Sequence, residues 1–406
     1  MEDFMIKLQD IWQAKENLAG VIHHTNLDLS FTFSQLSENK VFLKTENLQK
    51  TGSFKIRGAY NKIACLDSKA KEKGVIAASA GNHAQGVAFG ASKAGIVSTI
   101  VMPEGAPLSK VIATRGYGAN VILHGSGYDD SYKRALEIQK ETGAAFVHAF
   151  DDMEVIAGQG TIGLEILDDL PDVDAILAPI GGGGLISGIA AAVKCLKPSV
   201  KIFGVEAEGA ACVLSSRQKG KLDTLTSAQT IADGIAVKCP GTVTFDLIQK
   251  YVDDVITVSD EEIASTILLL LERSKLVAEG AGATALAALV YRKKLLQNKK
   301  VAVVISGGNI DVNFMSRIIE KGLVKTGRNV KLTTIMLDKP GNLQHFLSII
   351  AENKANVISI NHDRLDPDVA LDKAHVDVVL ETQSADHVSQ LVTNLKIQGY
   401  EVKITK

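Results

Sequence analysis

Ala175-Ile176-Leu177-Ala178-Pro179-Ile180-Gly181-Gly182-Gly183-Gly184-Leu185 is the stretch of sequence that decides the fold. The apolar run 175–178 predicts a buried strand, and the apolar spacing over 185–196 predicts a helix. Four glycines between them expose backbone amides at a helix start, a geometry that binds phosphate. No Lys-Ser/Thr pair follows, so this is not a Walker loop. The stretch predicts a strand, a phosphate loop and a helix, with close packing as the alternative role of the glycines.

Similar units extend from about residue 40 to about residue 325, which indicates βαβ units stacked on a parallel sheet. The strands read as continuous apolar runs, so we expect them to be buried on both faces, with helices covering both sides. Strands are expected at 75–78, 99–102, 121–123, 175–178, 202–205 and 301–305, and helical spacing is found at 131–141, 185–196 and 261–273.

The pattern changes after Thr326-Gly327-Arg328-Asn329. The expected order becomes strand, helix, strand, strand, helix and strand, at 332–337, 341–352, 357–361, 375–380, 385–398 and 401–405. This βαββαβ order is ferredoxin-like. We therefore expect an α/β chain with two domains, residues 1–326 and 331–406, and a smaller subdomain at roughly 41–150 inside the first.

The composition is that of an ordinary globular protein. Of 406 residues, 46% are hydrophobic and 22% are charged, with 44 basic against 46 acidic side chains. This balance excludes disorder and gives no electrostatic reason to expect nucleic acid or an anionic membrane as partner. Four scattered cysteines fit a reducing compartment. The amino terminus lacks the pattern of a signal peptide, and the glycines and Pro179 argue against a membrane span over 175–193, so we expect a cytoplasmic protein.

The segment T-G-S-F-K-I-R-G-A, residues 51–59, places Lys55 at the opening of a helical stretch beside Phe54. The positive end of the helix and partial desolvation both favour the neutral amine that forms an imine. A solvated lysine at a helix start remains the alternative on this segment alone.

A second segment, S-A-G-N-H-A-Q-G, follows the strand expected at 75–78. Its small residues expose amides at a helix start, suited to a carboxylate, and Asn82 can orient a ring hydroxyl. An ordinary capped turn would need only Ser79 or Asn82, and His83 by itself suggests a structural histidine.

Two further glycine motifs remain. Ser306-Gly307-Gly308-Asn309 follows the strand expected at 301–305, so the serine hydroxyl should point into the crevice where open α/β sheets bind ligands. An ordinary tight turn is the alternative on this motif alone. Gly158-Gln159-Gly160-Thr161-Ile162-Gly163 matches the dinucleotide fingerprint, but residues 153–157 before it look helical. We therefore expect these glycines to serve helix packing and not NAD binding.

Together and in this order, the segments S-F-K-I-R-G-A, S-A-G-N-H-A-Q-G, G-G-G-G-L and S-G-G-N resemble the fold type II pyridoxal-phosphate enzymes. The closest resemblance is to the threonine dehydratases (threonine ammonia-lyases), over essentially the whole chain. It implies that Lys55 holds pyridoxal phosphate as a Schiff base, that Phe54 packs against the ring, that Asn82 bonds its phenolic oxygen and that Ser306 meets the pyridine nitrogen. The phosphate would lie on Gly181, Gly182, Gly183, Gly184 and Leu185, and the substrate carboxylate on Ser79, Ala80, Gly81, Asn82 and His83.

The resemblance also implies a reaction. A neutral serine at the ring nitrogen makes a weaker electron sink than a carboxylate would, which favours prompt loss of a β-substituent. L-threonine would lose its α-proton to Lys55 and its β-hydroxyl with proton assistance from the cofactor phosphate, giving 2-oxobutanoate and ammonia. L-serine would give pyruvate, because a pocket discriminates one methyl group by only about 1–3 kcal/mol.

Other readings stay open. Related serine racemases carry a serine as second base where this chain has Ala80, and cysteine synthases usually carry T-S-G-N-T where it has His83. A non-catalytic amino-acid sensor is the alternative of another class. Some relatives bind a divalent cation near Glu206, but Ala210 and Cys212 supply no acidic partner, so we expect no metal. The role of Glu279, in A-E-G-A-G, is left open.

The tail resembles a single ACT-type regulatory domain, with D-K-P-G-N-L at its first strand-to-helix turn. The candidate effector residues are Asp338, Pro340, Gly341, Asn342 and Leu343. Such domains usually pair between subunits and bind an amino acid, which suggests isoleucine or valine as effector and a homodimer or homotetramer. A purely structural oligomerisation module is the alternative.

Overall fold

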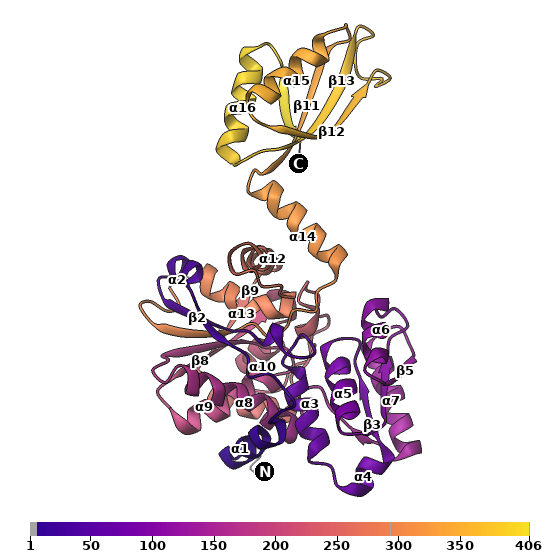
Figure 1. Cartoon of the computed structure of the whole chain (residues 1–406), viewed down its shortest axis with the longest axis vertical. Helices are drawn as coiled ribbons and strands as arrows, with labels where there is room; N and C mark the ends of the chain where they lie inside the picture. Colours follow the sequence, from indigo (N-terminus) through magenta and orange to yellow (C-terminus); the bar gives the residue numbers. More distant parts are fainter. Residues whose placement is uncertain (1–5, 293, 406) are drawn as a thin grey trace. The chain divides into compact units, whose positions relative to one another are not determined.

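The computed structural model describes residues 6–292 and 294–405 (Figure 1). The chain divides into two compact units, with the division between Ile310 and Asp311. The sequence-based division lay near residue 326, but helix α14 (Val312–Lys325) groups with the second unit. The expectation of no signal peptide falls partly on residues 1–5, which lie outside the described residues.

The larger sheet of the first unit has the strand order β1-β2-β10-β7-β8-β9. Only β1 runs antiparallel to its neighbour among these pairs. The strands expected at 175–178, 202–205 and 301–305 are confirmed as β7, β8 and β10. The bounds are β1 Leu27–Ser30, β2 Lys40–Lys44, β7 Ala175–Pro179, β8 Lys201–Ala207, β9 Asp254–Val258 and β10 Lys300–Val304.

Helices cover both faces of this sheet, because its central strands are apolar on both sides. Helix α9 (Gly184–Leu196) packs Ile186 and Ile189 against Ile176 and Ala302 of the sheet. Helix α13 (Gly280–Tyr291) lies against β7 to β10 on the opposite face (Figure 1). The expected doubly covered parallel sheet is therefore confirmed.

The smaller sheet has the parallel order β5-β4-β3-β6, with bounds β3 Val75–Ala78, β4 Ser98–Met102, β5 Asn120–Leu123 and β6 Ala145–Phe146. Helices α3 (Lys55–Ala64) and α5 (Asn82–Lys93) pack on one face and α7 (Tyr128–Thr142) on the other. The prediction that the strands are buried on both faces was wrong for β5. Asn120, Ile122 and Leu123 are exposed, because β5 is an edge strand. The smaller subdomain also starts later than residue 41, since β2 belongs to the larger sheet.

The second unit carries the expected βαββαβ order after α14. Its sheet is antiparallel with the order β12-β13-β11-β14, and the inward side chains Leu332, Val376 and Val378 pack on Phe346 and Leu391 of the two helices. The bounds are β11 Asn329–Leu337, α15 Asn342–Glu352, β12 Asn356–Asp363, β13 Lys373–Glu381, α16 Ala385–Ile397 and β14 Val402–Thr405.

The remaining helices complete the first unit. They are α1 Leu8–Leu18, α2 Phe31–Ser37, α4 Ser68–Lys73, α6 Leu108–Gly116, α8 Met153–Asp169, α10 Cys212–Lys219, α11 Thr242–Tyr251 and α12 Asp260–Leu269. The helix expected over 261–273 corresponds to α12 and a π-helical turn, Leu270–Ser274. Within the described ranges, no helix has the length and apolar character needed to cross a membrane.

The G-x-G-x-x-G motif lies inside α8, as expected for helix packing. A Cβ on Gly158 would lie 2.5 Å from the carbonyl oxygen of Arg57 and 2.7 Å from the Cα of Gly58. A Cβ on Gly163 would lie 3.0 Å from the carbonyl oxygen of Ile189. The glycines therefore let α8 approach the backbones of α3 and α9 closely.

We predict that Gly158→Ala lowers the free energy of unfolding by about 1–3 kcal/mol, because the added methyl group overpacks the contact between α8 and α3. Urea denaturation measures the change. Gly116→Ala is the matched control, since a Cβ there meets nothing within 4 Å. A Gly158→Ala protein as stable as the control would contradict the packing role.

Candidate active site

Two motifs far apart in the sequence run side by side around Lys55. The amide of Phe54 donates to the carbonyl oxygen of Ser306 at 3.1 Å, and the amide of Gly308 donates to that of Gly52 at 2.9 Å. Ser306 follows β10 closely, so its neighbourhood is the carboxyl edge of the larger sheet. Lys55, the first residue of α3, is thus brought to this edge, where open α/β sheets bind ligands.

The amine of Lys55 is held inside the site. Lys55 is half-buried as a residue, and its Nζ donates to the carbonyl oxygen of Ala149 at 3.0 Å and lies 5.3 Å from the centroid of the Phe54 ring. Burial lowers its pKa to about 8, against the opposing charge of Glu279. The neutral amine needed for imine formation is therefore accessible close to neutral pH, unlike that of a solvated lysine.

The tetraglycine loop lies next to this lysine. Phe150 follows Ala149 directly, and its atoms would lie 2.3 Å from a Cβ on Gly182 and 2.9 Å from one on Gly184. Gly183 has φ +99°, which favours glycine, and precedes the first residue of α9. The first amides of a helix lack intrahelical acceptors, so this turn can bind an anion.

The neighbouring loop residues of this turn also have defined places. Gly181 packs against the backbone of Ile235, with a Cβ–Cα separation of 2.9 Å if it had a side chain. The side chain of Leu185 is buried in the core of the larger sheet, which leaves only its amide to face an anion. The predicted phosphate residues thus form one continuous turn.

A chain of hydrogen bonds joins the two subdomains at Asn82, the first residue of α5. Asn82 Nδ2 donates to Glu279 Oε1 at 2.6 Å, and Asn309 Nδ2 donates to Asn82 Oδ1 at 2.8 Å. Asn309 also donates to the carbonyl oxygen of Thr51 at 2.8 Å. The sequence pointed to the segments of Asn82, Glu279 and Asn309 but not to the bonds between them, because no short-range pattern connects the three residues.

Glu279 is almost completely buried at the N-cap of α13. Burial raises its pKa to about 7, and the charge of Asp233 adds to the effect, while Lys110, Asn82 and Lys55 oppose it. Lys110 of α6 and Asp233 form an ion pair at 2.8 Å between the subdomains. This carboxyl group, whose role the sequence left open, therefore belongs to the site.

The loop expected to hold a substrate carboxylate connects β3 to α5. The hydroxyl of Ser79 accepts a hydrogen bond from the amide of Gly81 at 3.1 Å. His83 is buried, its Nε2 lies 2.8 Å from the carbonyl oxygen of Val147, and burial together with the charge of Lys55 lowers its pKa to about 3. The His83 side chain is thus neutral and structural, and it is the amides of this loop that are suited to an anion.

The residues around Lys55 fit pyridoxal phosphate on three observations. The hydroxyls of Thr51 and Ser53, within four residues of Lys55, are buried without a hydrogen-bond partner in the described residues. Buried polar groups normally have hydrogen-bond partners, so a bound polar molecule would satisfy these two hydroxyls. The glycine turn beside the amine leaves no room for side chains. Ser306 Oγ, 3.3 Å from the carbonyl oxygen of Ala281, is a neutral group suited to the ring nitrogen.

Glu206, near which relatives were expected to hold a cation, has another role here. Its carboxylate accepts the amides of Val213 and Leu214, both at 2.8 Å, and so caps α10. Over 6–292 and 294–405, no three His, Cys, Asp or Glu side chains converge to hold a metal ion.

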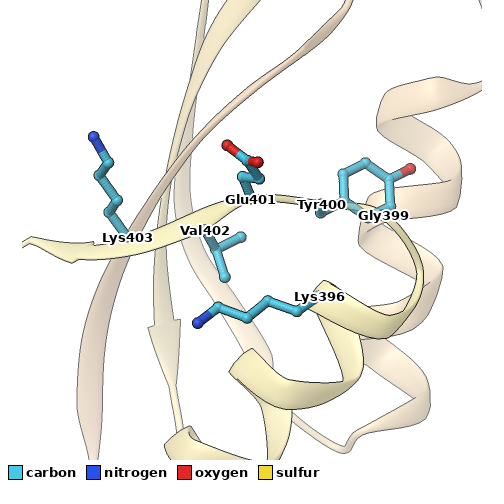
Figure 2. A pocket seen from close by; sticks show the side chains of 6 residues that line it. All are labelled: Lys396, Gly399, Tyr400, Glu401, Val402 and Lys403. Atoms are coloured by element: carbon cyan, nitrogen blue, oxygen red, sulfur yellow. The ribbon is translucent and has the colours of Figure 1, made fainter.

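The turn expected to bind an effector lies at the start of α15 in the second unit. Gly341 has φ +92° and precedes the helix, while the Asp338 carboxylate accepts from Arg364 Nε at 2.8 Å. The carbonyl oxygen of Asn342 accepts from the hydroxyl of Tyr400 at 3.2 Å. Tyr400 lines a surface hollow with Lys396, Gly399, Glu401, Val402 and Lys403 (Figure 2). Pro340 is exposed and Leu343 packs on the core of this unit.

Comparison with known proteins gives consistent relatives. The model of the family described as pyridoxal-phosphate dependent enzyme matches residues 19–307. An L-threonine ammonia-lyase of Thermotoga maritima is 53% identical over 98% of this chain and 100% of its own. A catabolic L-threonine dehydratase of Escherichia coli is 47% identical over 78% of this chain and 97% of its own.

Solved structures that resemble this chain include enzymes of the same kind. The processed threonine deaminase isoform 2 of Solanum lycopersicum is 36% identical with a TM-score of 0.73, over 77% of this chain and 93% of its own. A maize serine racemase is 37% identical with a TM-score of 0.74, over 79% of this chain and 98% of its own.

We predict that Glu279→Gln raises stability at alkaline pH. A carboxyl pKa raised from 4.5 to about 7 contributes stability that is present below the unfolded value and lost as pH rises through about 7, a loss of about 3 kcal/mol. Urea denaturation at pH values on both sides of this window should give equal stabilities at the acidic end and a more stable variant at the alkaline end. Part of the pH dependence persists, because burial also raises the pKa of Glu206 to about 7. Parallel curves for the two proteins would refute the prediction.

Proposed function

The chain belongs to the pyridoxal-phosphate-dependent enzyme family, and we propose that it is an L-threonine ammonia-lyase that carries the cofactor on Lys55. One observation carries the proposal: a lysine amine with lowered pKa lies beside a side-chain-free glycine turn and a neutral serine. The names of relatives at 53% and 47% identity support the reaction.

The cofactor would lie between these groups. The amides of Gly181 to Leu185 would hold the phosphate, Asn82 would bond the phenolic oxygen, Phe54 would pack on the ring and Ser306 would meet the ring nitrogen. Bound pyridoxal phosphate withdraws electrons from the α-carbon of an attached amino acid, which makes the α-proton acidic. Ser306 cannot supply a formal charge to the ring, which favours elimination over a long-lived carbanion.

Lys55 moves the proton. An amine with pKa of about 8 can accept the α-proton near neutral pH, and bases of that strength are efficient there. The amides of the Ser79 to His83 loop hold the substrate carboxylate at the start of α5. L-threonine yields 2-oxobutanoate and ammonia, and L-serine, shorter by one methyl group, yields pyruvate at a lower rate.

The competing activities differ at a few positions. Ala80 carries no group that could deliver a proton to the opposite face, so we expect no efficient racemisation of serine despite the likeness to a serine racemase. Cysteine synthase activity is disfavoured by His83, and a sensor without chemistry is disfavoured by the buried amine of Lys55.

The second unit acts as an ACT-type regulatory domain. Its βαββαβ topology and the glycine turn before α15 support this assignment. The T. maritima relative matches nearly the whole chain, whereas the E. coli relative leaves about a fifth of it unmatched. Isoleucine or valine would bind at the turn 338–343, in a homodimer or homotetramer located in the cytoplasm.

We predict that the protein reconstituted with pyridoxal phosphate forms 2-oxobutanoate from L-threonine, and pyruvate from L-serine more slowly. Lys55→Ala should lower kcat by at least about a thousandfold, since it removes both the attachment point and the base. A coupled dehydrogenase assay measures both products. Formation of D-serine, or activity only with sulfide and an O-activated serine, would replace this function by racemisation or β-replacement.

If the second unit is regulatory, isoleucine or valine should change the dependence of the reaction rate on threonine concentration. Gly341→Val should weaken the response, because a branched side chain is strained at φ +92°. The measurement is the half-saturating threonine concentration, with and without the effector. It requires active protein, so Lys55→Ala cannot be used for it. Kinetics unaffected by either amino acid at saturation would remove the proposal for the tail.

A further inference from the structure

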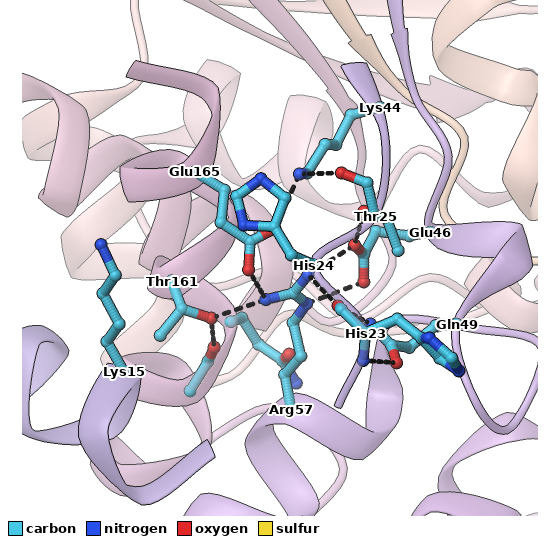
Figure 3. A network of polar contacts seen from close by, with 12 residues as sticks. Lys15, His23, His24, Thr25, Lys44, Glu46, Gln49, Arg57, Thr161 and Glu165 are labelled. Carbon is cyan, nitrogen blue, oxygen red and sulfur yellow. Dashed lines mark hydrogen bonds and ion pairs between the residues drawn. The ribbon is translucent and has the colours of Figure 1, made fainter. Parts of the chain in front are cut away.

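A buried ionic cluster, which we call the Arg57 cluster, lies next to the candidate active site and has no part in the chemistry described above. Its members are Lys44, Glu46, Arg57, Thr161 and Glu165. The Arg57 and Lys44 side chains are completely buried. Figure 3 shows Arg57 at the centre, between Glu165 and Thr161 on one side and Glu46 on the other.

The guanidinium of Arg57 uses its full fork of donors. Nε and Nη2 donate to the two oxygens of Glu46 at 2.8 and 2.7 Å. Nη1 and Nη2 donate to the two oxygens of Glu165 at 2.6 and 2.9 Å. Nη1 also meets the hydroxyl of Thr161 at 3.1 Å. Two bidentate pairs fix a guanidinium in position and orientation.

The cluster holds the first turn of α3 from the side opposite Lys55. Residues two apart on an α-helix lie about 200° apart around its axis, so Arg57 and Lys55 leave the helix in nearly opposite directions. Glu46 follows β2 of the larger sheet, and Glu165 and Thr161 belong to α8. The rotation of α3, and with it the direction of Lys55, is therefore tied to the larger subdomain.

The other side of the same turn is closely packed. A Cβ on Gly86 of α5 would lie 3.1 Å from the backbone of Lys55 and Ile56. On the side of the Arg57 cluster, a Cβ on Gly158 of α8 would likewise meet the backbone of Arg57 and Gly58. Such backbone contacts set the distance between helices but resist rotation weakly. The bonds of Arg57 supply the missing constraint.

Neither stability nor direct electrostatics accounts well for the cluster. Buried ion pairs are often no more stabilising than well-packed apolar residues. Two buried cations, Lys44 and Arg57, face the carboxylates of Glu46 and Glu165, so these four charges offset, and Lys44 also lies 3.8 Å from the more exposed carboxylate of Asp169. The charge that acts on the pKa of Lys55 is that of Glu279, outside the cluster.

We propose that Arg57 is a positioning residue for Lys55, which fixes the rotation of α3 so that the lysine amine stays enclosed beside Ala149 and the glycine turn. A rotation of about 10° would move an atom about 6 Å from the helix axis by about 1 Å. A misplacement of about 1 Å can reduce a rate about a hundredfold. The kinetic consequence rests on the proposed function, whereas the enclosure of the amine does not.

The chain offers a matched control on the same helix. Lys62, in the last turn of α3, pairs with Asp152 at 2.8 Å and with Glu154 at 3.1 Å. These bonds also tie α3 to the α8 region, but at the end away from Lys55. Lys62→Gln thus removes an ion pair of α3 without loosening its first turn.

The test variant is Arg57→Lys, which keeps the charge but cannot form two bidentate pairs. Competitive labelling of amines in the full chain before the cofactor is added, read by mass spectrometry from about pH 6 to about pH 10, gives the titration midpoint of Lys55. We expect it near pH 8 in the wild type and about one pH unit higher in Arg57→Lys, because a displaced amine is more hydrated. Lys62→Gln should leave it unchanged.

The reconstituted proteins supply a second readout. We expect kcat for threonine to fall at least about tenfold in Arg57→Lys, with a small change in KM, and to be retained in Lys62→Gln. If Arg57→Lys fails to fold, Thr161→Val, which removes one neutral partner of the guanidinium, should shift the Lys55 midpoint in the same direction by less.

A normal Lys55 midpoint and normal kcat in a less stable Arg57→Lys would overturn the proposal and make the cluster structural only. A normal midpoint in Thr161→Val, where Arg57→Lys does not fold, would do the same. Absence of threonine activity in the wild type would instead count against the proposed function, because the labelling of Lys55 needs neither cofactor nor substrate.

Discussion

The site depends on one constraint: a lysine amine has to be kept out of water at the start of a helix without a carboxylate bonded to it. Lys55 meets this constraint because its amine donates to the carbonyl oxygen of Ala149, and burial outweighs the distant charge of Glu279. A direct ion pair would have raised the pKa of the amine and removed its nucleophilic form. The neighbouring glycine turn offers amides suited to an anion, and Ser306 offers a neutral hydroxyl, around the same point.

The two sheets of the first unit, parallel except for β1, make this arrangement possible. Helix α3 packs between α5 of the smaller subdomain and α8 of the larger one, so its first turn is fixed from both sides. The hydrogen bonds of Asn82 with Glu279 and Asn309 join the same two subdomains within the site. Any change in the relation between the subdomains therefore acts on both the amine and the groups facing it.

Much of the fold and of the candidate site could be predicted because the signals are local. The apolar runs of β3 and β7 and the glycines at 181–184 each report on their own segment. Burial of β5 was wrong, because an apolar run does not reveal an edge strand. Strand β2 was not predicted, because it ends at the charged Lys44, whose burial in an ion pair cannot be read from the sequence. Glu279 lies 197 residues from Asn82, and Glu165 lies 108 residues from Arg57, so no sequence spacing could indicate these two partners.

The most direct measurement is the site of covalent attachment. The protein loaded with pyridoxal phosphate would be reduced with borohydride, digested and analysed by mass spectrometry. Attachment of the cofactor to Lys55 predicts one pyridoxyl group, on the peptide that contains Lys55, and none in Lys55→Ala. A pyridoxyl group on another lysine, or no stable adduct in the wild type, would contradict it.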